Sequence, residues 1–266
     1  SAPGACAVGV GDCMEIYILT LFPDMIQTVM RESIVGRAQD AGHIKVHAVN
    51  IRDYSTDKHK KVDDYPYGGG AGMVMFPQPI YDAVMAVRTQ VGREAPVIYL
   101  TPQGKTFSQE MAHDFAGEDA LILLCGHYEG IDERVIEEVV DAQVSIGDYV
   151  LTGGELAAMV VADAVARLVP GVLSDAECYT GESHWDGLLE YPQYSRPEVW
   201  HDRAVPAVLL SGHHGHVADW RTKESYKRTM RRRPDLFARF DESRLTTKHD
   251  RKVLAQARYG SKYING

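Results

Sequence analysis

Four glycine-rich segments carry the residues of this chain that are best suited to hold a ligand. They cover residues 67–73, 100–105, 125–134 and 146–155, and each lies at or near the end of an expected strand. Glycine lets the backbone approach a ligand and expose its N–H groups, and open parallel sheets bind ligands beyond the carboxyl ends of their strands. One such segment is usually only a turn. Four together favour a ligand site, in which Gly153 and Gly154 are expected to allow a close approach of backbone to ligand.

Neither of the two standard nucleotide-binding motifs is present. A P-loop ends in Gly-Lys-Ser/Thr and needs an earlier glycine at a fixed distance. Gly104, Lys105 and Thr106 provide the end, but Tyr99 occupies the position of that earlier glycine. A Rossmann-type fold needs glycines directly after its first strand, and residues 20–24 contain none. A nucleotide-like ligand would therefore be bound in another way, and a P-loop hydrolase is nearly excluded.

Arg167 and a group of histidines each allow two interpretations. Arg167 follows Asp163 by one helical turn, so it either forms an ion pair with that residue or supplies a cation to a developing anion. His213, His214 and His216 suggest a metal ion, but their spacing matches no zinc motif. The histidine spacing therefore favours a role in loop packing, and no metal ligand is assigned.

The cysteines indicate a reducing compartment. The four residues Cys6, Cys13, Cys125 and Cys178 form no CxxC or other paired spacing. Cys125 ends an apolar run and is expected to be a buried, reduced thiol, which favours the cytoplasm. No apolar run approaches the roughly 18–20 residues needed to span a bilayer, so no membrane partner is expected.

Hydrophobic periodicity predicts an α/β fold. Short apolar runs predict strands at residues 15–22, 44–51, 97–101, 121–125 and 143–146, of the type that is buried on both faces of a sheet. Helices are expected between and after them, at 77–91, 108–115, 132–140 and 153–168. This alternation is typical of a parallel sheet with helices on both faces.

Composition and charge change along the chain and predict two domains. The formal net charge is −9, yet residues 218–266 hold 14 of the 28 Lys and Arg and only 6 of the 37 Asp and Glu. We expect a leader or remnant outside the fold at 1–13, a ligand-binding domain at 14–173, a polar linker at 174–186 and a basic helical domain at 187–266. A helix over 217–233 would end before Pro234. The basic region is either a nucleic-acid contact or a solvated face.

Five long segments resemble one protein family. They are residues 58–70, CGHYEGIDER (125–134), IGDYVLTGGEL (146–156), residues 163–167 and LLSGHH (209–214). In this order, from about Met14 to Arg233, the chain is similar to the bacterial tRNA (guanine-N1)-methyltransferases, the TrmD family of the SPOUT superfamily. The resemblance implies transfer of a methyl group from S-adenosylmethionine to N1 of guanosine 37, beside the tRNA anticodon.

The resemblance also implies a fold and a cofactor site. The SPOUT fold is a parallel α/β sheet with a C-terminal trefoil knot, whereas physical rules disfavour knots and would predict an ordinary doubly wound sheet. The knot loops would hold S-adenosylmethionine mostly through backbone groups. By resemblance, the cofactor-binding residues are Leu100, Thr101, Pro102, Gly126, Tyr128, Glu129, Ile146, Gly147, Asp148, Tyr149, Val150, Leu151, Gly153 and Gly154.

The family's catalytic pair matches only in part. Arg167 corresponds to the proposed cation, while Glu182 stands where the family has an Asp as the proposed base, with Asp186 as the nearest alternative acid. The family forms obligate homodimers whose sites are shared between subunits, and the basic region would then bind tRNA phosphates. It is reported to use Mg²⁺, for which the sequence indicates no site. The competing hypothesis is a catalytically silent RNA-binding protein on the same scaffold.

Overall fold

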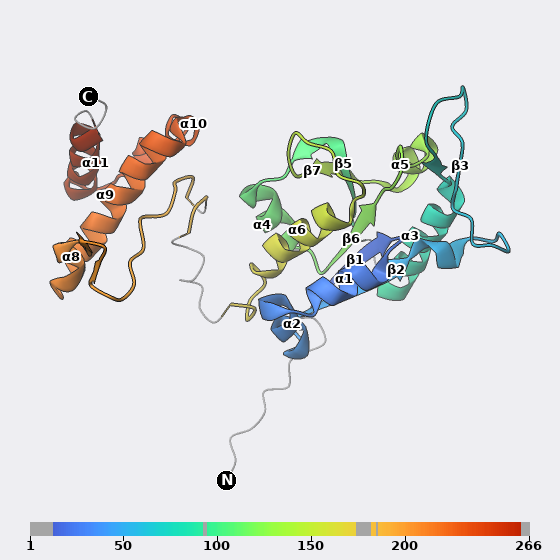
Figure 1. Cartoon of the computed structure of the whole chain (residues 1–266), viewed down its shortest axis with the longest axis horizontal. Helices are drawn as coiled ribbons and strands as arrows, with labels where there is room; N and C mark the ends of the chain where they lie inside the picture. Colours follow the sequence, from blue (N-terminus) through green and yellow to red (C-terminus); the bar gives the residue numbers. More distant parts are fainter. Residues whose placement is uncertain (1–12, 93–94, 174–181, 185, 262–266) are drawn as a thin grey trace, which may run out of the picture. The chain divides into compact units, whose positions relative to one another are not determined.

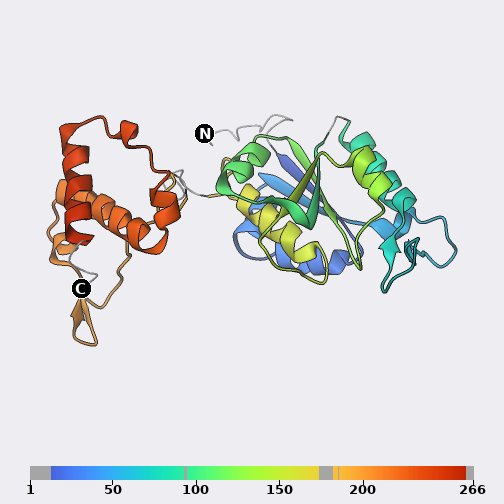
Figure 2. The same cartoon turned by 90° about the horizontal axis from the view of Figure 1, so that it is seen from above.

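A computed structural model describes residues 13–92, 95–173, 182–184 and 186–261. The chain divides into two compact units, residues 1–174 and 175–266, which are drawn in Figures 1 and 2. The expected leader, apart from Cys13, and most of the expected linker (174–181 and Trp185) lie outside the described residues.

The first unit is built on a five-stranded sheet in which every pairing is parallel. Its strands are β1 (Met14–Thr20), β2 (Ile44–Asn50), β5 (Val97–Thr106), β6 (Ala120–Cys125) and β7 (Ala142–Ser145). Their order across the sheet is β2-β1-β6-β5-β7. All six residues of β6 are buried, as expected for a strand covered on both faces. The prediction of a parallel α/β sheet is therefore confirmed.

Helices cover both faces of this sheet. On one face α3 (Pro77–Val91) and α5 (Glu133–Val139) pack against β1, β5 and β6 in a core that includes Tyr17, Ile80, Val84, Ile122 and Val135. The other face carries α6 (Glu155–Ala166), which contacts β1, β6, α1 (Pro23–Met30) and α4 (Gln109–Ala116). The first unit is completed by α2 (Ser33–Asp40) and the short helix η1 (Ile51–Tyr54). Ser108 caps α4 as predicted, since its hydroxyl accepts a hydrogen bond from the Met111 N–H.

Strand β5 is longer than predicted. The expected strand ended at Thr101, with a loop over 100–105, but β5 continues to Thr106. Its pairing with β7 shifts register, because Val144 lies opposite both Leu100 and Lys105. The second half of β5 can pair with β7 only because Gly104 has no side chain. A Cβ at this position would lie 2.4 Å from the backbone of Gln143 and Val144. The intervening residues are pushed out as a bulge.

A small hairpin lies beside the sheet. Its strands β3 (Asp63–Asp64) and β4 (Val74–Met75) pair antiparallel and are joined by the glycine-rich residues 65–73. Met75 of β4 bridges to Ile131. The hairpin therefore holds the glycine-rich segment against the loop that follows β6.

The second unit is mainly helical. It contains α8 (Ala207–Leu210), α9 (His214–Arg232), α10 (Pro234–Phe237), η2 (Glu242–Arg244) and α11 (Lys248–Ser261). It also has one hairpin, formed by β8 (Val199–Trp200) and β9 (Arg203–Ala204). Helix α9 begins three residues earlier than predicted and ends before Pro234 as expected. The unit has its own core of Leu188, Tyr226, Leu245, Val253, Leu254 and Ala257.

Candidate functional site

A cavity of about 380 Å³ lies beside the bulge of β5 and at the carboxyl ends of β6 and β7. Three chain segments line it, and thirteen of the fourteen expected cofactor-binding residues are among the lining residues. The exception is Asp148, which does not line the cavity. The volume falls in the range of small-molecule sites, roughly 300–1,000 Å³. The structure thus brings together the second, third and fourth glycine-rich segments.

The first glycine-rich segment lies next to the cavity but does not line it. Gly72 packs so closely that a Cβ would lie 2.4 Å from Cγ of Glu129, and the Glu129 N–H donates to the Met73 carbonyl over 3.0 Å. Tyr128, which does line the cavity, has Asp63 of β3 and Arg52 as neighbours; burial and the negative charge of Asp63 raise the pKa of Tyr128, while Arg52 opposes the shift. The segment therefore supports the cavity loop from outside.

Gly154 is required by the packing of two chain segments. Its N–H donates to the Gly126 carbonyl over 3.0 Å. A Cβ on Gly154 would lie 2.7 Å from the Cα of Cys125. Because that Cα is a backbone atom of a buried strand, it can shift only at a substantial cost in folding free energy. The sequence-based explanation, close approach to a ligand, missed this contact. The glycine first allows the chain before α6 to lie against the end of β6.

Glu155 is a buried carboxylate that joins three elements. Only 3% of the residue is exposed. Its Oε1 accepts a hydrogen bond from the Thr20 hydroxyl over 2.6 Å, and its Oε2 lies 2.8 Å from Nε2 of His127. The Thr20 hydroxyl in turn accepts the Phe22 N–H over 2.9 Å. The carboxylate thus connects the end of β1, the cavity loop after β6 and the first turn of α6.

Sequence reasoning missed this network because a Glu in a first helical turn is usually an exposed partner of the helix dipole. The available signal was its position directly after two glycines in an apolar helix. In the sequence Tyr99 indicates only that a P-loop is absent, but in the structure it lines the cavity. Its hydroxyl lies under Gly126, where a Cβ would be 2.8 Å away, and burial raises the pKa of Tyr99.

Cys125 is buried and free, as predicted. Burial, with a further contribution from the negative charge of Glu155, raises the pKa of Cys125 well above its ordinary value. Because the thiolate is the reactive form of cysteine, the Cys125 thiol has low reactivity.

The two expected catalytic residues belong to different units. Arg167 is half-buried at the end of α6, where its backbone N–H donates to the Asp163 carbonyl over 3.2 Å. Glu182 is half-buried in a segment of the second unit. Asp186 is exposed, and its Oδ1 accepts the Leu188 N–H over 3.0 Å.

The segment that carries Glu182 is attached to α9. The Leu189 N–H donates to the Thr229 hydroxyl over 2.8 Å, and the Ser225 hydroxyl donates to the Leu189 carbonyl over 2.6 Å. Closer to the acid, the Glu190 N–H donates to the Ser183 hydroxyl over 3.0 Å. The position of Glu182 is therefore coupled to the basic helix.

The histidine group has a structural role at the start of α9. Nδ1 of His213 accepts the His216 N–H over 3.2 Å and caps the helix, and the two rings stack with centroids 3.8 Å apart. Among the residues that the structure describes, no group of three or more His, Cys, Asp or Glu is placed to hold a metal ion. No helix in the same residues is both long and apolar enough to cross a membrane.

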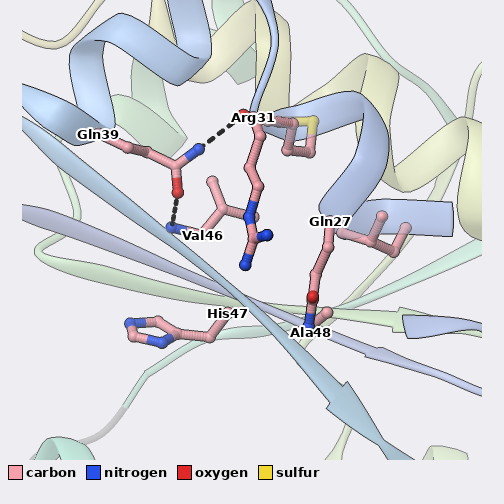
Figure 3. Close-up of a pocket in the computed structure, with 8 residues that line it drawn as sticks. Gln27, Arg31, Gln39, Val46, His47 and Ala48 are labelled. Atoms are coloured by element: carbon pink, nitrogen blue, oxygen red, sulfur yellow. Dashed lines mark hydrogen bonds between the residues drawn. The ribbon is translucent and has the colours of Figure 1, made fainter. Parts of the chain in front are cut away.

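A second cavity, of about 270 Å³, lies between α1, α2 and β2 (Figure 3). The Gln39 amide crosses it, donating to the Met30 carbonyl over 2.6 Å and accepting the Val46 N–H over 3.1 Å. None of the expected site residues lines it. Its polar contacts join α2 to the edge strand, which is a packing role.

Comparison with known proteins identifies the family of this chain. A family model described as tRNA (Guanine-1)-methyltransferase TrmD matches residues 14–239. A tRNA (guanine-N(1)-)-methyltransferase of Ruminiclostridium cellulolyticum is 57% identical over 232 residues, covering 87% of this chain and all of that protein. Proteins of the same name from Chloroflexus aggregans and Chloroflexus aurantiacus are 58% and 55% identical, covering 91% and 95% of this chain and 95% and 100% of their own length. The chain belongs to the TrmD family of tRNA (guanine-1)-methyltransferases.

Proposed function

We propose that this chain transfers a methyl group from S-adenosylmethionine to N1 of guanosine 37 in tRNA. Family membership supports methyl transfer to guanine in tRNA, and the relatives carry the same name at over 50% identity. The observation that carries the proposal is the cavity of about 380 Å³, which is lined by thirteen of the fourteen cofactor-binding residues that the family resemblance implies.

S-adenosylmethionine is proposed to bind in this cavity, within the trefoil knot that the family resemblance implies. When bound, the cofactor supplies an electrophilic methyl group on a sulfonium. The cavity is lined by segments from three neighbouring strands, and His127 and Gly153 of two of these segments are joined by a β-bridge. At Gly126, Gly153 and Gly154 a Cβ would meet protein atoms at 2.8, 2.2 and 2.7 Å. These close approaches show that the glycines let the lining segments pack against one another, and we propose that backbone groups of the lining residues hold the adenosine.

Arg167 and Glu182 are proposed to act on the guanine. N1 of guanine carries a proton and is a poor nucleophile, so a base must accept that proton as the methyl group moves. We assign this role to Glu182 because it stands where the family has its proposed base. Negative charge then develops on guanine O6, where the Arg167 guanidinium would stabilise it.

A homodimer would bring these two residues together. On the first unit, α1 and α6 are in contact and expose apolar side chains: Phe22, Met25, Val29, Leu156 and Val160 are each 39–50% exposed. Such a surface on adjacent helices is typical of a subunit interface. We propose that two copies meet there, and that the Arg167 of one subunit shares a site with the Glu182 of its partner.

The remaining assignments follow from the substrate. The basic second unit would bind tRNA phosphates, so affinity for tRNA should fall steeply with salt. A cytoplasmic location fits an enzyme that acts on tRNA. No described group fits Mg²⁺, and no step is assigned to it.

The test is a methyl-transfer assay with an unmodified tRNA transcript and labelled S-adenosylmethionine. We expect 1-methylguanosine at position 37, and no transfer to a transcript with adenosine there. Because Glu182 replaces the family's Asp, a second candidate function is an RNA-binding protein without catalytic activity. Tight binding of both cofactor and tRNA without any transfer would establish that candidate and overturn the enzyme.

A further inference from the structure

The β8–β9 hairpin of the second unit exposes a tryptophan. Trp200 is 60% exposed and Val199 is 56% exposed. Figure 2 shows this hairpin, in light orange, extending away from the helices of its unit. A large aromatic side chain left in solvent on a projecting element is typical of a surface that contacts a partner.

The hairpin is held in one conformation by its turn. His201 and Asp202 form a two-residue connection in which both have left-handed φ, +48° and +59°, the requirement of a type I′ turn. Neither residue is glycine, so the turn carries a conformational cost that the surrounding structure must balance. The Val205 N–H, which donates to the Glu198 carbonyl over 2.9 Å, closes the base of the hairpin.

This geometry places an aromatic ring and a cation on one face. Trp200 lies directly opposite Arg203 in the antiparallel pair, and directly opposite side chains share a face. The His201 ring packs on the Trp200 ring with centroids 4.3 Å apart, which restrains the indole. Across the described ranges, no acidic side chain or aromatic ring pairs with the Arg203 guanidinium.

We propose that the Trp200–Arg203 face binds one unpaired nucleotide of the tRNA. The base would stack on the indole, as bases do on aromatic side chains of RNA-binding proteins, and the Arg203 guanidinium would contact the adjacent phosphate. This inference rests on the proposed function, because it adds a contact to the same substrate. The hairpin belongs to the same compact unit as residues 218–266, where Lys and Arg outnumber Asp and Glu by 14 to 6, which favours RNA over a second copy of the protein.

The experiment measures binding of an unmodified tRNA transcript to the full-length protein at several salt concentrations. Trp200→Ala should weaken tRNA binding roughly 5- to 150-fold, the range for losing one stacked base. Trp200→Phe keeps a ring and should lose less. Arg203→Ala should make the dependence of log affinity on log salt shallower by about one. Affinity for S-adenosylmethionine should be unchanged in all three.

Val199→Ala is the matched control, since Val199 is equally exposed but points to the other face of the hairpin. It should bind tRNA like the parent. Addition of tRNA should also quench tryptophan fluorescence in the parent more than in Trp200→Phe. The proposal is overturned if Trp200→Ala binds tRNA like the parent, or if it loses affinity only by dissociating a dimer in sedimentation. If the parent binds tRNA but does not methylate it, the proposed activity is contradicted. The comparison of tRNA affinities between the parent and Trp200→Ala would still decide whether the hairpin binds RNA.

Discussion

The carboxylate of Glu155 lies 2.8 Å from Nε2 of His127, in the interior of the first unit. Removing a charge from water is costly unless it is hydrogen-bonded on several sides, and Glu155 has His127 on one oxygen and Thr20 on the other. His127 lines the cavity and Glu155 begins α6. This pair therefore fixes the cavity loop to the helix that ends at Arg167.

Truncation of the buried acid should destabilise the protein. Glu155→Ala leaves both Thr20 and His127 without their partner, and each buried unsatisfied group costs about 1–3 kcal/mol. Urea unfolding should show this loss, and calorimetry should show weaker binding of S-adenosylmethionine. Glu155→Gln, which can still accept from Thr20, should lose less, and Thr20→Ser should resemble the parent. An Ala variant as stable as the parent would show that the network contributes nothing.

A side chain at position 154 should disturb the fold as well as the site. In Gly154→Ala the new Cβ would lie 2.7 Å from the Cα of Cys125, and overpacking of this kind costs about 1–3 kcal/mol. We expect lower stability together with weaker cofactor binding, and both losses should be larger in Gly154→Val. Gly117→Ala is the control, because Gly117 is right-handed and its nearest neighbour would be a carbonyl oxygen 3.3 Å away. Full stability with lost cofactor binding would restore the simpler ligand-contact explanation.

Local patterns predicted the five strands of the sheet and the helices α3, α4, α5, α6 and α9, because period and capping are encoded in neighbouring residues. Ser108 and Pro234 marked helix boundaries that the structure confirms. The extension of β5 was missed because it depends on Gly104 lying against Gln143, thirty-nine positions along the chain. The burial of Glu155 was missed for the same reason, since its partner Thr20 is 135 residues away. Tertiary contacts of this length leave no periodic signal.

The thiol of Cys125 should resist modification in the folded protein. Burial raises the pKa of Cys125, so the thiol remains protonated at pH values at which an exposed thiol ionises. Alkylation at pH 8 followed by mass spectrometry should leave Cys125 unmodified, and unfolding in urea should expose it. Because the folded-state pKa is the higher one, this group's contribution to stability is fully present below pH ~9 and declines as the pH rises above that value. Cys125→Ala should reduce that alkaline decline, whereas an unchanged slope would assign it to other groups.

Mixing two inactive variants should restore activity if the site is shared between subunits. Arg167→Ala removes the proposed cation and Glu182→Gln the proposed base, and in a mixed dimer one of the two sites would contain both native residues. Subunit exchange, followed by a methyl-transfer assay, should recover up to about half of the parental rate per mixed dimer, because one of two sites works. No recovery after confirmed exchange would place both residues in the site of the same subunit.

The identity of the base can be decided by three variants in single-turnover methylation. Glu182→Gln keeps size and polarity but cannot accept the N1 proton, so the transfer rate should fall by roughly 10²- to 10⁴-fold with little change in cofactor affinity. Glu182→Asp restores the family's residue but shortens the side chain by roughly 1.5 Å. If the segment bound to α9 through Leu189 and Thr229 has adapted to the longer acid, this variant should be slow. A rate equal to or above that of the parent would show that the segment has not adapted.

Asp186→Asn is the control for the position of the base. The Asn side-chain oxygen can still accept the hydrogen bond that the Leu188 N–H now donates to Asp186, so the turn should persist. A normal rate in Glu182→Gln together with a collapsed rate in Asp186→Asn would move the base to Asp186, four residues further along the chain.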